Sequence, residues 1–282
     1  MPIDAPLCPE DGDVFGHVVV FDSGVGGLTV AHELRDLAPS LLIDYAADTG
    51  FFPYGDKSDA DLRDRLPKVA QALYEHIKPD VFVIACNTAS TLALDDVRAV
   101  LPIPVVGTVP AIKPAVAKSK TGTIGLLATP GTIRRDYTDR LIEDFAKDTI
   151  VLKHGSIDLV ALAESAARGE APPIEAFKAA QSALFDMPGG DEIDTIVLAC
   201  THFPLVRDEL VASAPHDVCY IDSGEAIARQ TMRRLAEVKR NASSERFMPQ
   251  AFITDDPVGR EVLVSVFERF GFSSTEMVAV SR

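Results

Sequence analysis

The sequence predicts an α/β protein that contains two α/β domains with mainly parallel sheets. Short runs rich in valine, isoleucine and leucine alternate with longer helical patterns along nearly the whole chain of 282 residues, which is typical of βαβ units around a buried parallel sheet. The alternation forms two successive series. Two of the apolar runs end alike, VFVIACNTAS at 81–90 and TIVLACTHFP at 195–204, so a cysteine closes a strand twice in one chain.

The first series contains four expected strands and three expected helices. The helices cover 28–38, 60–77 and 91–101, and Pro67 either kinks the second of them or marks its true start. The strands cover 17–21, 41–47, 81–85 and 105–107.

The second series follows a proline- and lysine-rich stretch at 109–122, which we interpret as a domain boundary. After the series come an amphipathic helix over 222–238 and a strand-helix-strand tail that we assign to the first domain. The expected division is a flexible leader over 1–16, a first domain over 17–110 plus 223–282, and a second domain over 111–222. Its expected strands cover 123–128, 150–154, 195–199 and 218–222, and its helices cover 132–146, 159–169 and 174–185.

The composition argues against several classes of function. A hydrophobic fraction of 47% and a charged fraction of 24% are typical of a folded, soluble protein. The net charge of −15 argues against nucleic acid as a ligand, because nucleic-acid binders carry a basic face. No apolar run reaches the roughly 18 residues of a membrane span, and no secretory signal is readable. We therefore expect a cytoplasmic protein without a membrane partner.

The four cysteines indicate reduced thiols, since there is no CxxC and no His/Cys cluster at zinc-ligand spacing, and no metal is expected. Cys8 and Cys219 receive no role. Cys86 and Cys200 each end a strand, where the N-terminus of the next helix lowers the pKa of a thiol and favours the thiolate. A single cysteine of this kind more often only packs, whereas a matched pair followed by hydrogen-bonding side chains favours chemistry.

A glycine-rich turn, DSGVGG at 22–27, follows the first expected strand. It matches the dinucleotide-binding pattern G-x-G-x-x-G only weakly, because Thr29 stands where the third glycine belongs. An NAD-dependent enzyme is therefore a weaker alternative. Asp22 and Ser23 place a carboxylate and a hydroxyl at the strand end, which suits a polar substrate. The other interpretation is a tight turn whose glycines serve backbone geometry alone.

Other candidates surround these motifs. The segment Pro53–Gly55 forms a rigid aromatic loop able to cover a small ligand, although alone it is ordinary turn chemistry. His202 stands two residues after a thiol and is a candidate to hold or relay its proton. Glu164 lies in a mostly apolar helical stretch, where the pattern alone favours a solvated position.

Five motifs in order, FDSGVGGLTV, PYGDKS, IACNTAS, LATPGTIRRDY and VLACTHFPLV, resemble glutamate racemase of the aspartate/glutamate racemase family from about residue 17 onward. The resemblance implies two similar, doubly wound α/β domains that are pseudo-symmetric about an interdomain active site. It also implies a cofactor-independent isomerase that converts L-glutamate to D-glutamate for peptidoglycan, and hence a part in cell-wall biogenesis and cell shape.

The resemblance implies roles for single residues. Inversion of a stereocentre by proton transfer requires one base and one acid on opposite faces. Cys86 is implied to act on D-glutamate and Cys200 on L-glutamate, as one coupled pair. Asp22 is implied to adjust the first thiol, and His202 and Glu164 the second. Substrate binding is implied for Asp22, Ser23, Pro53, Tyr54, Gly55, Asn87, Thr88, Thr132, Thr201 and His202.

Other functions stay open at this point. A racemase that acts on aspartate would differ only in the depth of its pocket, which the sequence does not reveal. A non-catalytic regulator is an alternative from another class, because some members of the resembled family inhibit DNA gyrase. The two cysteines argue against a purely binding role, and no residue supports a gyrase interaction. The resemblance also suggests a homodimer, again without a residue that supports it.

Overall fold

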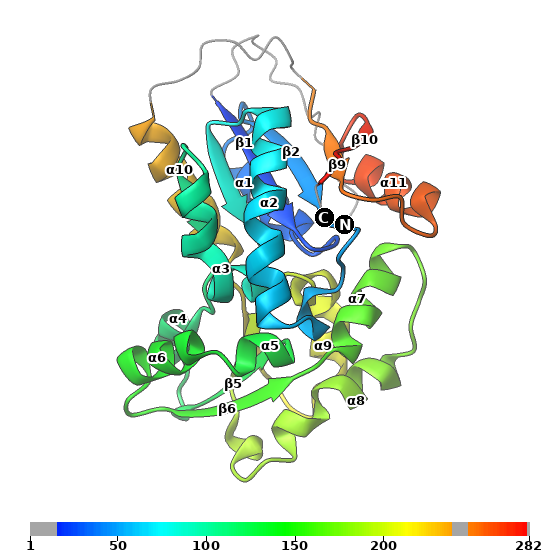
Figure 1. Cartoon of the computed structure of the whole chain (residues 1–282). Helices are drawn as coiled ribbons and strands as arrows, with labels where there is room; N and C mark the ends of the chain where they lie inside the picture. The colour runs from blue at the N-terminus through cyan, green and yellow to red at the C-terminus, as the bar shows by residue number, and fades with distance from the viewer. Residues whose placement is uncertain (1–15, 239–247, 281–282) are drawn as a thin grey trace.

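The computed structural model describes residues 16–238 and 248–280 and contains two β-sheets, one above the other in Figure 1. The first sheet has six strands and the second has four. All the paired strands run parallel. Cys8 and the rest of the expected leader before Gly16 lie outside the described residues.

The six-stranded sheet combines the first series with the C-terminal tail. Its strand order is β10-β9-β2-β1-β3-β4, and β9 joins it by pairing with β2. The strands are β1 (His17–Asp22), β2 (Leu42–Ala47), β3 (Val81–Ile84), β4 (Val105–Gly107), β9 (Ala251–Ile253) and β10 (Thr275–Met277). The helices around this sheet are α1 (Leu28–Leu37), α2 (Asp59–Ile77), α3 (Asn87–Val100), α10 (Gly224–Glu237) and α11 (Arg260–Arg269), with a short 3₁₀ helix η1 (Tyr54–Asp56).

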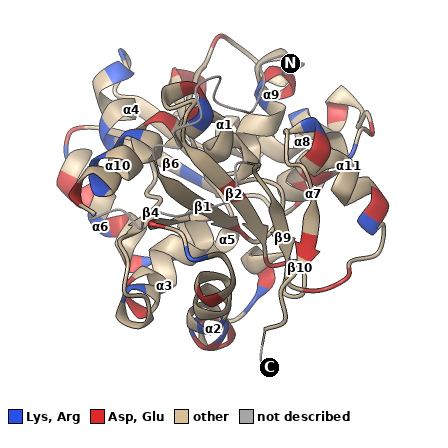
Figure 2. Cartoon of the chain, turned by 90° about the horizontal axis from the view of Figure 1, so that it is seen from above, with Lys and Arg blue, Asp and Glu red and all other residues tan. Residues whose placement is uncertain are grey.

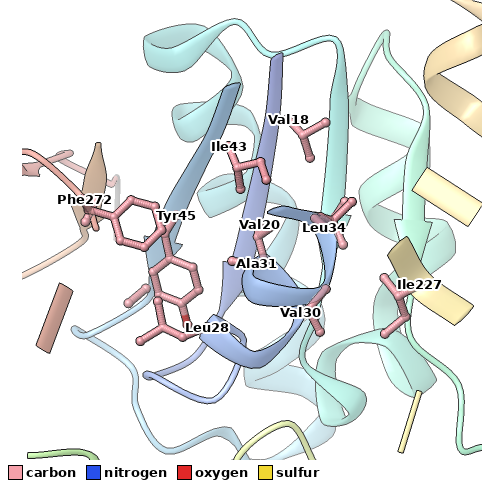
Figure 3. Packing of buried hydrophobic residues seen from close by; sticks show 14 of the residues in the cluster. Val18, Val20, Leu28, Val30, Ala31, Leu34, Ile43, Tyr45, Ile227 and Phe272 are labelled. Atoms are coloured by element: carbon pink, nitrogen blue, oxygen red, sulfur yellow. The ribbon is translucent and has the colours of Figure 1, made fainter. Parts of the chain in front are cut away.

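Strand β1 explains why the apolar runs are continuous. Val18 and Val20 pack with α1, α10 and α11 on one face of the sheet, as Figure 3 illustrates for α1 and Ile227 of α10. Val19 and Phe21 pack with α2 and α3 on the other face. A parallel strand covered on both faces needs apolar side chains at every position. Charged residues accordingly lie mainly on the surrounding helices in the view from above (Figure 2).

The four-stranded sheet is formed by the second series, in the order β6-β5-β7-β8. Its strands are β5 (Thr123–Ala128), β6 (Ile150–Gly155), β7 (Thr195–Ala199) and β8 (Cys219–Ile221). Helices α4 (Ile112–Lys118) and α6 (Asp136–Phe145) pack on one face. The other face is covered by α7 (Asp158–Ala167), α8 (Ile174–Phe185), η3 (Phe203–Val206) and α9 (Arg207–Ser213). Helix α5 (Pro130–Ile133) and η2 (Gly190–Glu192) lie in connections.

The two sheets repeat one arrangement. In the first sheet the initial four strands lie in the order β2-β1-β3-β4, and in the second sheet they lie in the matching order β6-β5-β7-β8. Cys86 follows β3 and Cys200 follows β7, which are equivalent strands. The expected fold class, two α/β domains with parallel sheets, is confirmed. The residue boundaries that we drew between the domains remain a proposal.

Several elements differ from the expectation. The expected boundary stretch contains α4, and α9 was not anticipated. The helix expected over 132–146 is two helices, because Thr129 caps α5 with its side chain and the chain turns at Arg134–Arg135 before α6. Helix α2 begins at Asp59 behind the cap residue Ser58, so Pro67 does not mark its start.

Candidate active site

The two cysteines that follow equivalent strands line one cavity of about 80 Å³. Both thiols are free, and each residue is only 6% exposed. Residues of both halves form the wall. They are Ser23, Phe52, Pro53, Tyr54, Gly55, Asp56, Cys86, Asn87, Thr88, Thr129, Ile157, Val160, Ala161, Cys200, Thr201 and His202.

The position of the cavity follows from the strand orders. In each sheet the second strand lies on one side of the first strand and the third strand lies on its other side. The direction of winding therefore reverses between β1 and β3 in the six-stranded sheet and between β5 and β7 in the four-stranded sheet. Binding sites of open α/β sheets lie at the carboxyl ends of the strands beside such a reversal. Here Ser23 and Cys86 lie at one reversal and Thr129 and Cys200 at the other, and all four line the cavity.

The environment of Cys86 corrects one expectation from the sequence. Cys86 stands directly before α3, as the position of the helix N-terminus predicts. Nevertheless, burial raises the pKa of its thiol, and the negative charge of Asp22 raises it further. The backbone N–H of Ala89 and the hydroxyl of Ser23 act in the opposite direction but do not compensate. Desolvation therefore outweighs the helix terminus, and Cys86 holds its proton.

Cys200 has a different neighbour. The sulfur of Cys200 lies 3.9 Å from His202 Nδ1, and His202 Nε2 lies 2.8 Å from Glu164 Oε1. Burial lowers the pKa of His202, but the hydrogen bonds to Cys200 and Glu164, together with their charges, raise it well above its usual value. A protonated imidazole at this position places a positive charge beside the sulfur of Cys200. The two thiols therefore lie in electrostatically unequal surroundings.

Glu164 is buried and does not take the solvated position that its helical pattern favours. Burial raises the pKa of Glu164, but the hydrogen bond and charge of His202, the Val25 N–H and the charge of Arg168 lower it below its usual value. The Val25 N–H donates to Oε1 over 3.0 Å, and Arg168 Nε lies 3.6 Å from Oε2. Glu164 does not line the cavity; it contacts the cavity through His202.

Asp22 also lies behind the cavity wall. Its carboxylate is fully buried and accepts hydrogen bonds from the Ser23 hydroxyl over 3.2 Å and from the Gly24 N–H over 3.0 Å. The Thr201 hydroxyl of the other half donates to it over 2.7 Å. Three donors fix the orientation of this carboxylate beside Cys86.

A second contact between the halves is a chain of hydroxyl groups at the cavity wall. Thr88 Oγ1 lies 3.0 Å from Thr129 Oγ1, which lies 3.1 Å from Thr132 Oγ1. Thr88 and Thr129 line the cavity, whereas Thr132 is fully buried and does not. Thr132 therefore reaches the cavity only through Thr129, a residue that the sequence analysis did not select.

The remaining expected site residues, Ser23, Pro53, Tyr54, Gly55 and Asn87, all line the cavity. Asn87 stands out because its Oδ1 is buried and has no hydrogen-bond partner in the protein. Burying such an oxygen costs free energy unless a ligand or a water molecule donates a hydrogen bond to it. Among the described residues, no group of three or more histidine, cysteine or acidic side chains is arranged to hold a metal ion.

The glycine-rich turn has a role that the sequence analysis did not recognise. A Cβ on Gly24 would overlap Glu164 Oε1, and a Cβ on Gly26 would overlap His202 Nδ1 and Thr201 Oγ1. Neither glycine has a positive φ angle. These glycines therefore serve close approach of the other half of the molecule, and the turn is a docking surface for the residues around Cys200.

Comparison with known proteins decides the family. Residues 29–231 match the family described as Asp/Glu/Hydantoin racemase. The chain belongs to this family. A glutamate racemase of Sphingopyxis alaskensis is 50% identical over 76% of this chain and 80% of its own length.

Solved structures of racemases agree with this membership. A glutamate racemase of Escherichia coli, in complex with L-glutamate and the activator UDP-MurNAc-Ala, has a TM-score of 0.89 and 42% identity, and the match covers 95% of this chain and 99% of that one. A glutamate racemase of Francisella tularensis in complex with D-glutamate has a TM-score of 0.75 and 26% identity, covering 95% of this chain and 98% of that one. The expected resemblance to glutamate racemase is confirmed, and with it the enzyme class.

Several wall residues of this family member escaped the sequence analysis. Phe52, Ile157, Val160 and Ala161 form an apolar part of the wall, and an apolar residue in a loop or helix carries no signal that separates a pocket from a core. Thr129 did carry a signal, because it follows β5 as Ser23 follows β1. Aligning the two strand series would have found it.

Proposed function

We propose that this racemase interconverts L-glutamate and D-glutamate by proton transfer between Cys86 and Cys200, without a cofactor. The observation that carries the proposal is the shared cavity: two free thiols, one from each half, line a single small space. A substrate carbon between them would have an acid on one face and a base on the other, which is what inversion by proton transfer requires.

The unequal surroundings of the two thiols suggest which one acts first on L-glutamate. Protonated His202 places a positive charge beside the Cys200 sulfur, which favours Cys200 as the base, while burial and Asp22 keep Cys86 in its thiol form. The Cys200 thiolate removes the α-proton of L-glutamate, and the electron pair of the C–H bond moves toward the α-carboxylate. The Cys86 thiol then gives its proton to the opposite face and becomes a thiolate. D-glutamate reacts by the same steps in reverse.

The wall supplies donors for the substrate carboxylates. The Ser23 and Thr201 hydroxyls donate their protons to Asp22, whereas Thr88 stands at the end of a hydroxyl chain and is free to donate to a substrate when Thr129 donates to it. The first-turn N–H groups of α3 add further donors, because they have no acceptor inside the helix. Donors that are fixed in place stabilise the negative charge of the transition state, each by about 3 kcal/mol. This arrangement also explains how an acidic protein binds an anion, because nearby donors outweigh a distant, screened net charge.

Three further assignments complete the proposal. Asn87 Oδ1, which is buried and unpartnered, accepts a hydrogen bond from the α-ammonium group of the substrate. Thr132 supports substrate binding indirectly, by fixing Thr129. Asp22 adjusts Cys86 from behind the wall, and His202, which lines the wall and is held by Glu164 behind it, adjusts Cys200.

The test is incubation of the purified protein with L-glutamate in heavy water. We expect the circular dichroism of glutamate to decay to zero and deuterium to appear at the α-carbon of newly formed D-glutamate while the remaining L-glutamate still carries hydrogen. Early product without deuterium would contradict two separate bases. A parallel incubation with L-aspartate distinguishes the closest alternative substrate. Absence of both signals with glutamate would overturn the proposal.

The cellular assignments rest on family membership. D-glutamate is a peptidoglycan component, so we propose that the enzyme supplies cell-wall synthesis and works in the cytoplasm. Among the described helices, none combines the length and apolar character needed to cross a membrane. A homodimer remains an expectation from the resemblance alone, and a gyrase interaction has no supporting residue.

A further inference from the structure

Asp48 is a fully buried carboxylate that lies outside the wall of the cavity and has no part in the proton transfers described above. It follows the carboxyl end of β2. Three side chains from separate segments bind it. The Tyr54 hydroxyl donates to Oδ2 over 2.6 Å, the Thr254 hydroxyl donates to Oδ1 over 2.6 Å, and Arg65 donates to both oxygens over 3.1 and 2.7 Å.

Backbone contacts tie Asp48 to the end of β1 and to the segment that precedes Tyr54. The Asp48 N–H donates to the Asp22 carbonyl oxygen over 3.0 Å, and the Phe51 N–H donates to the Asp48 carbonyl oxygen over 3.0 Å. The guanidinium carbon of Arg65 lies 6.0 Å from the centre of the Phe51 ring. Asp48 thus connects the end of β1, helix α2 and the connection after β9 to one loop, residues 51–57.

This loop supplies Phe52, Pro53, Tyr54, Gly55 and Asp56 to the cavity wall. Tyr54 is buried, and its single hydroxyl proton is donated to Asp48. Burial and the charge of Asp48 raise the pKa of Tyr54 well above its usual value, so the hydroxyl stays a donor at neutral pH. Because that proton is engaged, Tyr54 has no hydroxyl proton left for a substrate carboxylate.

We propose that Asp48 is a positioning residue that acts through Tyr54: with Arg65 and Thr254 it holds the loop 51–57 against the cavity and so sets substrate affinity. The expected change in substrate affinity rests on the proposed function. The position of the loop does not depend on it. The recognition of substrate by the loop is therefore through its shape and its backbone groups, with the Tyr54 hydroxyl as an internal anchor.

The same helix offers a matched control for this unit. Arg63, two residues before Arg65, binds Asp96 of α3 over 2.5 Å, and both side chains are largely exposed. An exposed ion pair contributes little to stability. Replacing Arg63 or Arg65 by methionine removes one guanidinium group from α2 in each case, but only Arg65 reaches Asp48.

The kinetic test compares Asp48→Asn, Tyr54→Phe, Arg65→Met and Arg63→Met. We expect the KM for L-glutamate to rise about tenfold in Tyr54→Phe, because one charge-assisted hydrogen bond is lost. The KM should rise at least as much in Asp48→Asn, which also weakens the contacts with Arg65 and Thr254. The fall in kcat/KM should come mainly from the rise in KM. The double variant Asp48→Asn/Tyr54→Phe should have the KM of Asp48→Asn, because the Tyr54 hydroxyl acts only through Asp48. Arg63→Met should behave as the wild type.

A second readout does not depend on racemisation. Alkylation of Cys86 by iodoacetamide, followed by peptide mass spectrometry, reports how well the loop covers the cavity, and half-exposed Cys219 reports general unfolding. We expect Cys86 to react about tenfold faster in Asp48→Asn, Tyr54→Phe and Arg65→Met, with Cys219 unchanged, because a loosened loop opens locally. Tyr54→Phe changes no charge, so its effect reports access alone.

The outcomes separate this inference from the proposed function. If the wild type fails to racemise glutamate but Cys86 becomes more reactive in the variants, the proposed substrate is wrong and the positioning role stands. If the wild type racemises glutamate and folded Asp48→Asn or Tyr54→Phe shows an unchanged KM and unchanged Cys86 reactivity, the inference is overturned. Should Asp48→Asn fail to fold, Tyr54→Phe and Arg65→Met decide by the same criteria.

Discussion

The Thr201 hydroxyl donates a hydrogen bond to Asp22 Oδ2 over 2.7 Å. Thr201, which follows Cys200, is thereby bound to the carboxylate of Asp22 beside Cys86. The two halves of the site are therefore structurally coupled, and a change on one side of the cavity is expected to reach the other.

Replacing Thr201 by valine removes this hydrogen bond while keeping the shape of the side chain. A hydrogen bond to a charged group contributes about 1.5–3 kcal/mol, so we expect kcat/KM to fall about tenfold or more. The fall should be equal for both enantiomers, because their equilibrium constant is unity. Thr231→Val is the control: Thr231 is also buried, but its hydroxyl donates within α10 to Ile227. Equal kinetics in the two variants would contradict the coupling.

Cys86→Ser and Cys200→Ser should each abolish racemisation, because a serine hydroxyl is too weak an acid to replace either thiol at neutral pH. Exchange of the α-proton with heavy water on one face is expected to persist slowly in one direction. Chiral chromatography measures the first effect and α-deuterium content the second. Normal turnover in either variant would exclude the two-base scheme.

The charge difference between the thiols predicts a difference in their reactivity. At neutral pH, Cys200 should be alkylated faster than Cys86, because the positive charge of protonated His202 lies beside the Cys200 sulfur while burial raises the pKa of the Cys86 thiol. His202→Asn should slow Cys200 by about tenfold or more and reduce racemisation by about 10²-fold. His216→Asn, at a half-buried histidine bound to the Ile193 carbonyl, should change neither. Equal reactivity of the two thiols in the wild type would contradict the assignment.

A methyl group at Gly26 should disrupt the contact between the halves. Gly26→Ala would press against His202 and Thr201, and we expect activity to fall by about 10²-fold because the catalytic groups move by a fraction of an ångström. Gly131→Ala is the control near the same cavity, where an added Cβ meets only ordinary van der Waals contacts. A Gly26→Ala enzyme with wild-type kcat would show that this close approach is not needed.

His202 also predicts a dependence of stability on pH. Its pKa in the folded protein lies above the value of about 6.5 in an unfolded chain. The contribution of His202 to the free energy of unfolding is therefore fully present below about pH 6.5 and is lost as the pH rises through the pKa of His202 in the folded protein. The difference in unfolding free energy between the wild type and His202→Asn should be smaller at about pH 9 than at about pH 6. Urea unfolding at both pH values measures this difference in unfolding free energy. A difference that grows with pH would contradict the prediction.

The fold class was predictable because a parallel sheet leaves a simple pattern. Val18 to Phe21 are apolar at every position, since both faces of β1 are covered. Helices α4 and α9 were harder to predict, because both are short and the chain around α4 is rich in proline and lysine, which looked like a linker. Local pattern does not reveal that tertiary packing stabilises such a short helix.

The reactive residues were predictable, but their electrostatics were not. Cys86 and Cys200 stand out because they repeat at matching strand ends, whereas the burial that raises the pKa of Cys86 is a property of the assembled site. Glu164 illustrates the same limit: its helical position resembles a solvated one until the glycine turn and His202 are brought against it. Contacts between distant segments leave no local signal.

The hydrogen bonds from Thr201 to Asp22, from Val25 to Glu164 and between Thr88 and Thr129 all span the boundary between the two sheets. Together these three bonds hold the two halves of the molecule against each other around the thiols. Any motion that moved the two halves apart would have to break these bonds, so their combined strength opposes a widening of the cavity. Substitutions that weaken these bonds are accordingly expected to loosen the contact between the halves and to admit more water to the two thiols.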